Sequence, residues 1–262
     1  MKIKFDKYQG VGNDFIIFDN RENILNKITA EQVNKMCDRR FGIGSDGLML
    51  LNKKEGFDFE MVYFNADGNE GSMCGNGGRC ITQFACTIGI KKKQYLFSAI
   101  DGVHKSEITL GKEVKLQMSD VTNIDFSLDH YILDTGSPHY VKFITGIKDF
   151  DVVTEGRKIR KSKDFAKKGI NVDFVETLSD DKIYVRTYER GVEDETLSCG
   201  TGVTASALVA AHNDNGFNRV EVKTNGGNLS VEFDKKSDME FANIWLCGPA
   251  TFVYSGEIEL KV

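Results

Sequence analysis

The sequence predicts an α+β protein built from two similar halves, each rich in strands and wrapped around one buried helix. The first observation is a repeat, because Met73-Cys74-Gly75-Asn76-Gly77 and Ser198-Cys199-Gly200-Thr201-Gly202 are related motifs whose cysteines lie 125 positions apart (199 − 74). The second is that aromatic and β-branched segments, typical of strands, precede both motifs. The third is that small and apolar residues, typical of a buried helix, follow both.

Length and composition place the chain among ordinary globular proteins. It has 262 residues, of which 40% are hydrophobic and 28% charged, so it can bury the core of one large domain or of two smaller ones. A net charge of −5, from 34 basic and 39 acidic side chains, leaves no basic excess to neutralise phosphates. We therefore expect neither extended disorder nor nucleic-acid binding.

The sequence pattern favours a cytoplasmic location. The first ten residues alternate charged and apolar side chains and lack the apolar run of a signal peptide. No stretch approaches the ~20 apolar residues of a membrane-spanning helix, so no membrane partner is expected. In a reducing compartment the six cysteines are expected to be thiols rather than disulfides.

The offset of 125 positions brings further residues of the two halves into register. One match would be coincidence, whereas several at one offset indicate an internal duplication. The matched pairs are Gly44 with Gly169, Tyr63 with Tyr188, Asn65 with Arg190, and Gly102 with Gly227.

The expected elements follow a similar order in both halves. Aromatic and β-branched content predicts strands over 57–64, 113–118, 182–188, 219–223 and 229–233. Helices are predicted over 79–88 and 203–212, and the second is almost entirely apolar and therefore buried. Asn225-Gly226-Gly227 predicts a hairpin turn, and the polar stretch 119–127 separates the halves.

The two motif cysteines have a position suited to acid–base chemistry. Each lies where a helix begins, so that backbone N–H groups could bind a carboxylate and the helix dipole would lower the pKa of the thiol. If Cys74 and Cys199 face one bound molecule from opposite sides, a thiolate can remove a proton from one face of a carbon and a thiol can return one to the other. This pattern predicts inversion of a stereocentre beside a carboxylate, without a cofactor.

The remaining cysteines fit small buried apolar residues better than ligands. Cys74, Cys80 and Cys86 lie six positions apart, which is not a zinc-binding spacing, so we predict no metal. The cysteines assigned to the core are Cys37, Cys80, Cys86 and Cys247.

At these residues the chain closely resembles the diaminopimelate epimerases. The resemblance runs through nearly the whole sequence, and its motifs are jointly specific. In the first half they are Lys7-x-x-Gly10-x-Gly12-Asn13-Asp14-Phe15, Gly42-Ile43-Gly44-Ser45-Asp46-Gly47, Phe64-Asn65-Ala66-Asp67-Gly68 and Cys74-Gly75-Asn76-Gly77-Gly78-Arg79-Cys80. In the second half they are Gly136-x-Pro138-His139, Asn171-Val172-x-Phe174-Val175, Tyr188-Glu189-Arg190-Gly191, Cys199-Gly200-Thr201-Gly202 and Gly248-Pro249-Ala250.

The resemblance implies two pseudo-symmetric α+β lobes, each a mainly antiparallel sheet or barrel wrapped around a central helix. It places residues 1–118 with about 252–262 in the lobe of Cys74 and residues 119–251 in the lobe of Cys199, because the last strand, near 256–262, returns to the first lobe. It also implies an active site in the cleft between the lobes. The implied reaction converts LL-diaminopimelate to the meso isomer, for lysine and peptidoglycan-precursor synthesis, without a cofactor. A homodimer is among the assemblies it allows.

The resemblance also implies roles for individual residues. Cys74 and Cys199 match the two acid–base cysteines, and His139 and Glu189 match groups that orient or tune the thiols. The backbone amides of four helix-start residues would hold the reacting carboxylate: Gly75, Asn76, Gly200 and Thr201. The distal amino-acid end would be held by Asn13, Asn65, Asn171 and Arg190, and Glu189 is also expected to bind substrate. Arg190 suits this role because a guanidinium pairs bidentately with a carboxylate.

Three departures from the family pattern affect distal recognition rather than catalysis. Ser137 stands where many members have Asn, so a direct contact there would become water-mediated or vanish. Gly47 offers no side chain to the substrate. The segment Gly191–Thr196 is one residue longer than the common pattern, so this loop must bulge.

Three other functions remain open on the residues. A proline or hydroxyproline racemase or epimerase would use the same two cysteines, but a proline-like ring has no second amino-acid end for Arg190, Asn65 and Asn171. A redox dithiol protein would more often carry C-x-x-C, which is absent. A non-catalytic binding module would tolerate Cys→Ser at both positions. Because two facing thiols could oxidise, we also expect oxidised protein to be inactive and reductant to restore it.

Overall fold

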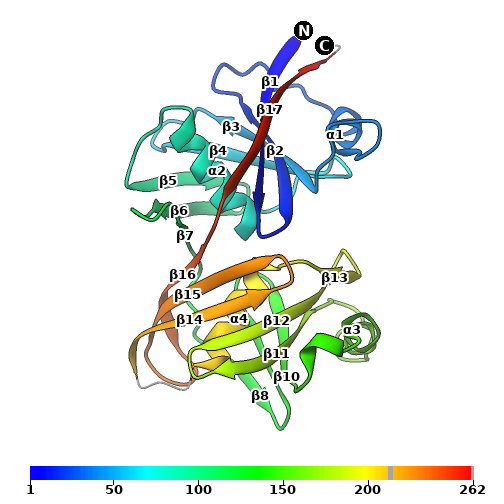
Figure 1. Cartoon of the computed structure of the whole chain (residues 1–262), viewed down its shortest axis with the longest axis vertical. Coiled ribbons are helices and arrows are strands. Elements are labelled where there is room, and N and C mark those ends of the chain that lie inside the picture. Colours follow the sequence, from blue (N-terminus) through cyan, green and yellow to red (C-terminus); the bar gives the residue numbers. More distant parts are fainter. Residues whose placement is uncertain (212–214, 261–262) are drawn as a thin grey trace. The chain divides into compact units, whose positions relative to one another are not determined.

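The computed structural model describes residues 1–211 and 215–260, and the chain forms two compact units (Figure 1). Unit 1 comprises Met1–Leu116 and Pro249–Val262, and unit 2 comprises Gln117–Gly248. No helix in the described part of the chain is long and apolar enough to cross a membrane.

Unit 1 contains a mixed, mainly antiparallel set of strands. β2 and β3 are parallel, β3 and β4 antiparallel, and β4 and β5 parallel, while β1 pairs antiparallel with β2 and with β17. β5, β6 and β7 form an antiparallel meander. The elements are β1 (Lys2–Gly10), β2 (Asn13–Asp19), α1 (Ala30–Cys37), β3 (Gly47–Asn52), β4 (Phe59–Asn65), α2 (Gly75–Thr87), β5 (Gln94–Ala99), β6 (Gly102–Ile108), β7 (Val114–Gln117, at the unit boundary) and β17 (Thr251–Glu259).

Unit 2 repeats this plan. β10 and β11 are parallel, β11 and β12 antiparallel, and β12 and β14 parallel, and β14, β15 and β16 form an antiparallel meander. β9 pairs antiparallel with β8 and β10, and β13 with β12. The elements are β8 (Asp125–Ser127), β9 (His130–Asp134), β10 (Pro138–Phe143), η1 (Ile147–Asp149), α3 (Val152–Arg160), β11 (Asn171–Ser179), β12 (Lys182–Glu189), β13 (Asp194–Thr196), α4 (Gly200–Ala210), β14 (Gly216–Thr224), β15 (Gly227–Lys235) and β16 (Phe241–Gly248).

The shared order of parallel and antiparallel pairs confirms the predicted duplication. Backbone conformation agrees, because the matched glycines Gly44 and Gly169 both have positive φ, 82° and 76°. Gly102 and Gly227 also match, with φ of 134° and 147°. Such angles strain residues that carry a Cβ, which explains why the repeat keeps glycine at these places.

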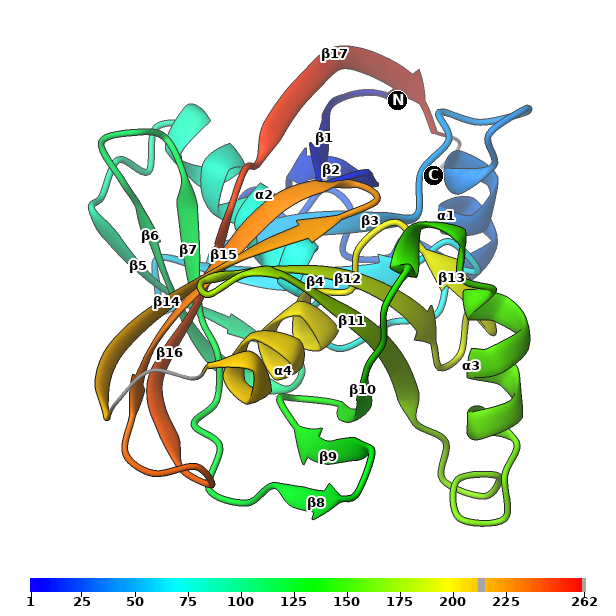
Figure 2. The ribbon, with the colours of Figure 1, turned by 60° about the horizontal axis from the view of Figure 1, so that its bottom comes forward.

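Each unit surrounds one helix, as predicted. α2 packs against β1, β2, β3 and β6, and α4 against the strands from β9 to β12 and from β14 to β16. Figure 2 shows α4 inside the curve of these strands. In α4 only Thr201 and Val209 are not fully buried, because Ala, Val and Leu leave the helix without a polar face.

Both central helices begin earlier than the ranges predicted from their apolar runs. α2 starts at Gly75 and α4 at Gly200, directly after the cysteines, rather than at 79 and 203. The small-residue and apolar runs alone begin at 79 and 203, because glycine has low helix propensity. The expectation that each Gly-x-Gly motif opens its helix is confirmed. The predicted end of the second helix, His212, lies outside the described residues, and α4 ends at Ala210.

The predicted strands are confirmed with small shifts at their ends. They correspond to β4, β7, β12, β14 and β15, and Asn225 and Gly226 form the turn between β14 and β15. The last strand, β17, begins at Thr251 and pairs antiparallel with β1 along unit 1 (Figure 1). Its predicted last residues, Lys261 and Val262, lie outside the described part of the chain.

Candidate active site

The two motif cysteines are equivalent in the fold, because each is the residue immediately before a central helix. Cys74 precedes α2 and Cys199 precedes α4. Most helices begin after Ser, Thr, Asp or Asn, whose oxygens accept hydrogen bonds from first-turn amides, as Thr29 does for α1. A cysteine there combines a thiol with the amide groups and positive dipole end of a helix, a site suited to a carboxylate.

Cys199 lies in an environment that disfavours the thiolate. Its side chain is buried, and burial together with the carboxylates of Glu189 and Asp173 raises its pKa well above the ordinary value. Hydrogen bonds from Thr201 and from the Gly202 amide act in the opposite direction. The prediction that the helix dipole would lower the pKa is therefore wrong for Cys199, because desolvation outweighs the dipole.

A chain of hydrogen bonds runs from Cys199 into the core of unit 2. Its sulfur lies 3.4 Å from Thr201 Oγ1, which lies 2.8 Å from His139 Nε2. His139 Nδ1 lies 2.6 Å from Asp173 Oδ2, and Thr187 donates to the other Asp173 oxygen at 2.6 Å. His139 is thus placed beside the Cys199 site, but through the Thr201 hydroxyl and not by direct contact.

Sequence reasoning missed Asp173 as a site residue. It lies in β11 between Val172 and Phe174, and all three side chains are buried. A carboxylate in an otherwise apolar buried strand is costly unless it is paired, and this was the available signal.

The close approach of α4 to these groups requires glycine at position 202. A Cβ there would overlap Asp173 Oδ1 and lie 3.2 Å from His139 Cε1. The second glycine of the motif therefore brings the helix start against the His139–Asp173 pair.

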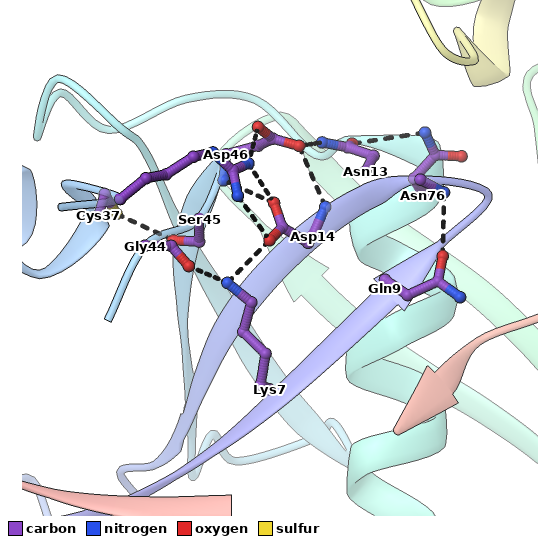
Figure 3. Close-up of polar contacts among 11 residues, drawn as sticks. Lys7, Gln9, Asn13, Asp14, Cys37, Gly44, Ser45, Asp46 and Asn76 are labelled. Atoms are coloured by element: carbon purple, nitrogen blue, oxygen red, sulfur yellow. Dashed lines mark hydrogen bonds and ion pairs between the residues drawn. The ribbon is translucent and has the colours of Figure 1, made fainter. Parts of the chain in front are cut away.

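Cys74 has different hydrogen-bond partners, and Figure 3 shows the residues around its partner Asn13. Its thiol donates to Asn13 Oδ1 over 3.6 Å, and Asn76 Nδ2 donates to the same oxygen over 3.4 Å. Asn13 Nδ2 donates to Asp46 Oδ2 at 2.7 Å. Because a carboxylate only accepts hydrogen bonds, Asp46 sets the orientation of the amide and turns its oxygen toward Cys74.

A group of charges fixes this arrangement in unit 1 (Figure 3). Arg39 binds Asp14 at 2.6 Å and Asp46 at 2.7 Å, and the buried Lys7 binds Asp14 at 2.9 Å and also donates to the Gly44 carbonyl. Burial tends to raise the pKa of Asp14, but hydrogen bonds from Arg39 and Lys7 lower it to about 2. Sequence reasoning placed these charges in motifs without assigning them this role.

Ser137 joins two of the predicted distal-end residues in unit 2. Its hydroxyl oxygen accepts from Asn171 Nδ2 at 2.9 Å and from Arg190 Nη2 at 3.2 Å. Asn171 Oδ1 accepts from the Arg190 amide at 2.8 Å, and Arg190 Nη1 donates to the Lys168 carbonyl. The short serine therefore anchors the exposed Arg190. The expected effect of Ser137 on contact with the substrate stays a prediction.

Asn65 and Gly47 lie at one end of the unit 1 strands, with Asn13. Asn65 ends β4, and its Nδ2 lies where a side chain at Gly71 would project. At Gly47 a side chain would meet the ring and hydroxyl of Tyr63. Tyr63 thus fills the space that Gly47 leaves open.

The longer segment before Cys199 forms a tight turn. Glu193 has φ of 59°, and its amide donates to the Glu189 carbonyl at 2.8 Å. Glu189 ends β12, and its charge acts on Cys199.

The structure divides the predicted site residues between the units. Unit 1 contains Asn13, Asn65, Cys74, Gly75 and Asn76, and unit 2 contains His139, Asn171, Glu189, Arg190, Cys199, Gly200 and Thr201.

All six cysteines are free thiols. Burial raises the pKa of Cys80 to about 12 and also raises that of Cys37, as expected for unreactive core residues. Among the described residues, no three His, Cys, Asp or Glu side chains gather to hold a metal ion.

A family model described as diaminopimelate epimerase matches residues 5–124 and 131–253. The chain belongs to the diaminopimelate epimerase family. Among relatives named diaminopimelate epimerase, that of Flavobacterium psychrophilum is 47% identical, with 98% of this chain and all of the relative aligned. That of Chlorobaculum tepidum is 45% identical, over 96% of this chain and 99% of the relative.

Solved structures share the fold at low sequence identity. A Bacillus anthracis phenazine biosynthesis protein of the PhzF family is 16% identical, with a TM-score of 0.75 over 99% of this chain and 100% of that one. A hydroxyproline epimerase of Agrobacterium vitis is 13% identical, with a TM-score of 0.69 over 98% and 92%. These likenesses confirm the predicted two-lobed α+β fold class.

Proposed function

We propose that this chain interconverts LL- and meso-2,6-diaminopimelate by moving the α-proton between the thiols of Cys74 and Cys199, without a cofactor. The observation that carries the proposal is the equivalence of the two cysteines at the starts of α2 and α4, in a chain that belongs to the diaminopimelate epimerase family. Inversion needs removal of a proton from one face and delivery to the other, which two opposed thiols supply.

The reacting carboxylate would lie between the two helix starts. The backbone amides of Gly75 and Asn76 in α2, and of Gly200 and Thr201 in α4, belong to first turns whose N–H groups have no helical carbonyl to bind. Four amides and two dipole ends would hold the carboxylate and stabilise the negative charge that develops when the α-proton leaves.

The distal end of the substrate would be held by Asn13, Asn65, Asn171 and Arg190. Arg190 is exposed and anchored by Ser137, so it can offer its remaining N–H groups to a carboxylate. The asparagine amides carry both donors and acceptors, as an amino-acid end with ammonium and carboxylate requires. A proline-type substrate would leave these groups without a partner.

His139 and Glu189 would tune the thiol of Cys199 rather than touch the α-carbon. His139 reaches Cys199 through Thr201, and the charge of Glu189 favours the protonated thiol.

Each unit would contribute one thiol to the same substrate molecule. Exclusion of water from the bound substrate would strengthen the electrostatic interactions around the reacting carbon. The reaction belongs to lysine and peptidoglycan-precursor synthesis, which places the protein in the cytoplasm.

The test is a stereochemical assay with a panel of substrates and reduced protein. We expect conversion of LL-diaminopimelate to the meso isomer, and no inversion of L-proline or trans-4-hydroxy-L-proline. Inversion of the proline compounds instead would assign the chain to the alternative epimerase. No turnover of any of them by folded protein with free thiols would contradict the proposal and favour a redox or binding function.

A further inference from the structure

The two cysteines occupy equivalent positions, yet their hydrogen-bond partners differ in kind. Cys199 is linked through Thr201 Oγ1 to His139 Nε2, with separations of 3.4 and 2.8 Å. Cys74 is linked to Asn13 Oδ1, 3.6 Å away. An imidazole can take up a proton near neutral pH, whereas a carboxamide cannot.

Asp173 fixes the imidazole so that its reactive nitrogen faces Thr201. Its side chain is fully buried, and its two oxygens accept from Thr187 Oγ1 and from His139 Nδ1, both at 2.6 Å. His139 Nδ1 therefore carries a hydrogen, which leaves Nε2 as the acceptor in the neutral ring. Asn171 Nδ2, a donor 3.5 Å from Nε2, agrees with this tautomer.

Resting on the proposed function, we infer that Thr201 relays the proton of Cys199 to His139, with Asp173 as the positioning residue. In the first state the Cys199 thiol donates to Thr201 Oγ1 and the Thr201 hydroxyl donates to His139 Nε2. The thiol proton then moves to Oγ1 as the hydroxyl proton moves to Nε2. The second state holds a Cys199 thiolate, an unchanged threonine and an imidazolium paired with Asp173.

The surroundings of Cys199 explain why such a relay is needed. The thiol is buried and faces two carboxylates, Glu189 and Asp173, so a thiolate formed without a nearby cation would be strongly disfavoured. An imidazolium at His139 supplies that cation, and the Gly202 amide and the Thr201 hydroxyl would donate to the sulfur.

The internal repeat places the different partners of the two cysteines at equivalent positions. The offset that relates Cys74 to Cys199 also relates Asn76 to Thr201 and Asp14 to His139. In unit 1 these positions hold an amide and a carboxylate that is ion-paired to Lys7 and Arg39.

The first test compares Thr201→Val with Thr201→Ser. Valine keeps the shape and the backbone amide but removes the hydroxyl, and serine restores the hydroxyl. We expect kcat to fall about 100-fold in Thr201→Val with KM changed less than about threefold, and Thr201→Ser to recover most of the rate. Wild-type kcat in Thr201→Val, or equal loss in both variants, would overturn the relay.

The second test uses Asp173→Asn, which removes the charge that stabilises the imidazolium. Asp173 also repels a Cys199 thiolate, but it hydrogen-bonds directly to His139 Nδ1, so we expect loss of the imidazolium partner to have the larger effect. The acidic limb of the kcat/KM profile should therefore move to higher pH, and a move to lower pH would contradict the relay. A limb that stays in place in folded Asp173→Asn protein would contradict the role of Asp173. Failure of the wild-type protein to invert diaminopimelate would instead reject the proposed function.

Discussion

The two thiols have unequal surroundings at the level of single residues. Cys199 is buried against Glu189 and Asp173, and Cys74 is half-buried and donates to Asn13. The two thiols would therefore transfer protons on opposite faces of the substrate although their surroundings differ. What the two sites share is the backbone of a helix start.

Removing either thiol should abolish inversion. In Cys74→Ala or Cys199→Ala one face of the α-carbon has no acid or base, so we expect epimerisation in both directions to fall at least about 1,000-fold. Cys247→Ala, which alters a buried thiol away from the helix starts, is the matched control and should retain wild-type kcat. Substantial activity of Cys199→Ala on both LL and meso substrates would refute the two-base mechanism.

Asp46 should affect kcat/KM because it orients the side chain of Asn13. Asp46→Asn can present a donor to Asn13 Nδ2, so the amide loses its fixed orientation toward Cys74. The loss of one charge-assisted hydrogen bond predicts a fall of about tenfold in kcat/KM. Asp129→Asn, which changes an exposed carboxylate paired with Lys142, should have no effect. Equal rates in the two variants would exclude a positioning role for Asp46.

At the scale of elements, the start of α4 depends on a glycine that no side chain can replace. In Gly202→Ala the new Cβ would overlap Asp173 and displace it or His139. We expect the free energy of unfolding to fall by about 1–3 kcal/mol and kcat to fall with it. Gly111→Ala is the control, because the nearest atom to a Cβ there is Thr109 Oγ1 at 3.7 Å. Urea unfolding gives the free energy of unfolding of both variants. Equal free energies of unfolding for Gly202→Ala and Gly111→Ala would contradict this packing.

Elements were more predictable than contacts. The repeat predicted two units with one buried helix each, because glycines and cysteines that recur at a fixed offset indicate the same backbone conformation in both halves. The helix starts at Gly75 and Gly200 were predicted from the Gly-x-Gly motifs and not from helix propensity, which is low for glycine. Thr201 was expected to act only through its amide, and its hydroxyl bond to His139 depends on how β10 and α4 meet, which no local pattern encodes.

At the scale of the whole molecule, the charges of unit 1 tie its stability to pH. The folded-state pKa of Asp14 is about 2, below the ordinary 3.8, because Arg39 and Lys7 donate to it. A lowered pKa contributes stability above about pH 4 that is lost as pH falls toward 2. Arg39 is more than half exposed, so screening reduces the contribution at pH 7 to about 1–2 kcal/mol.

Comparing wild type with Asp14→Asn in urea unfolding measures this contribution. The wild-type advantage should be largest at neutral pH and should shrink between about pH 4 and 2. Arg219→Ala would remove the exposed ion pair with Glu221 in unit 2 and should leave the difference between wild type and Asp14→Asn unchanged. A difference between wild type and Asp14→Asn that stays constant with pH would show that Asp14 acts by packing alone.

The central claim is that protons leave and arrive on opposite faces through different thiols. The most direct measurement is NMR of LL-diaminopimelate with reduced protein in D2O during the first few per cent of turnover. Two thiols predict deuterium at the inverted α-carbon of the meso product, while the remaining LL substrate is still unlabelled, because the arriving proton comes from a thiol that has exchanged with solvent. Meso product that retains the original α-proton would mean that one base returns it, and would contradict the account.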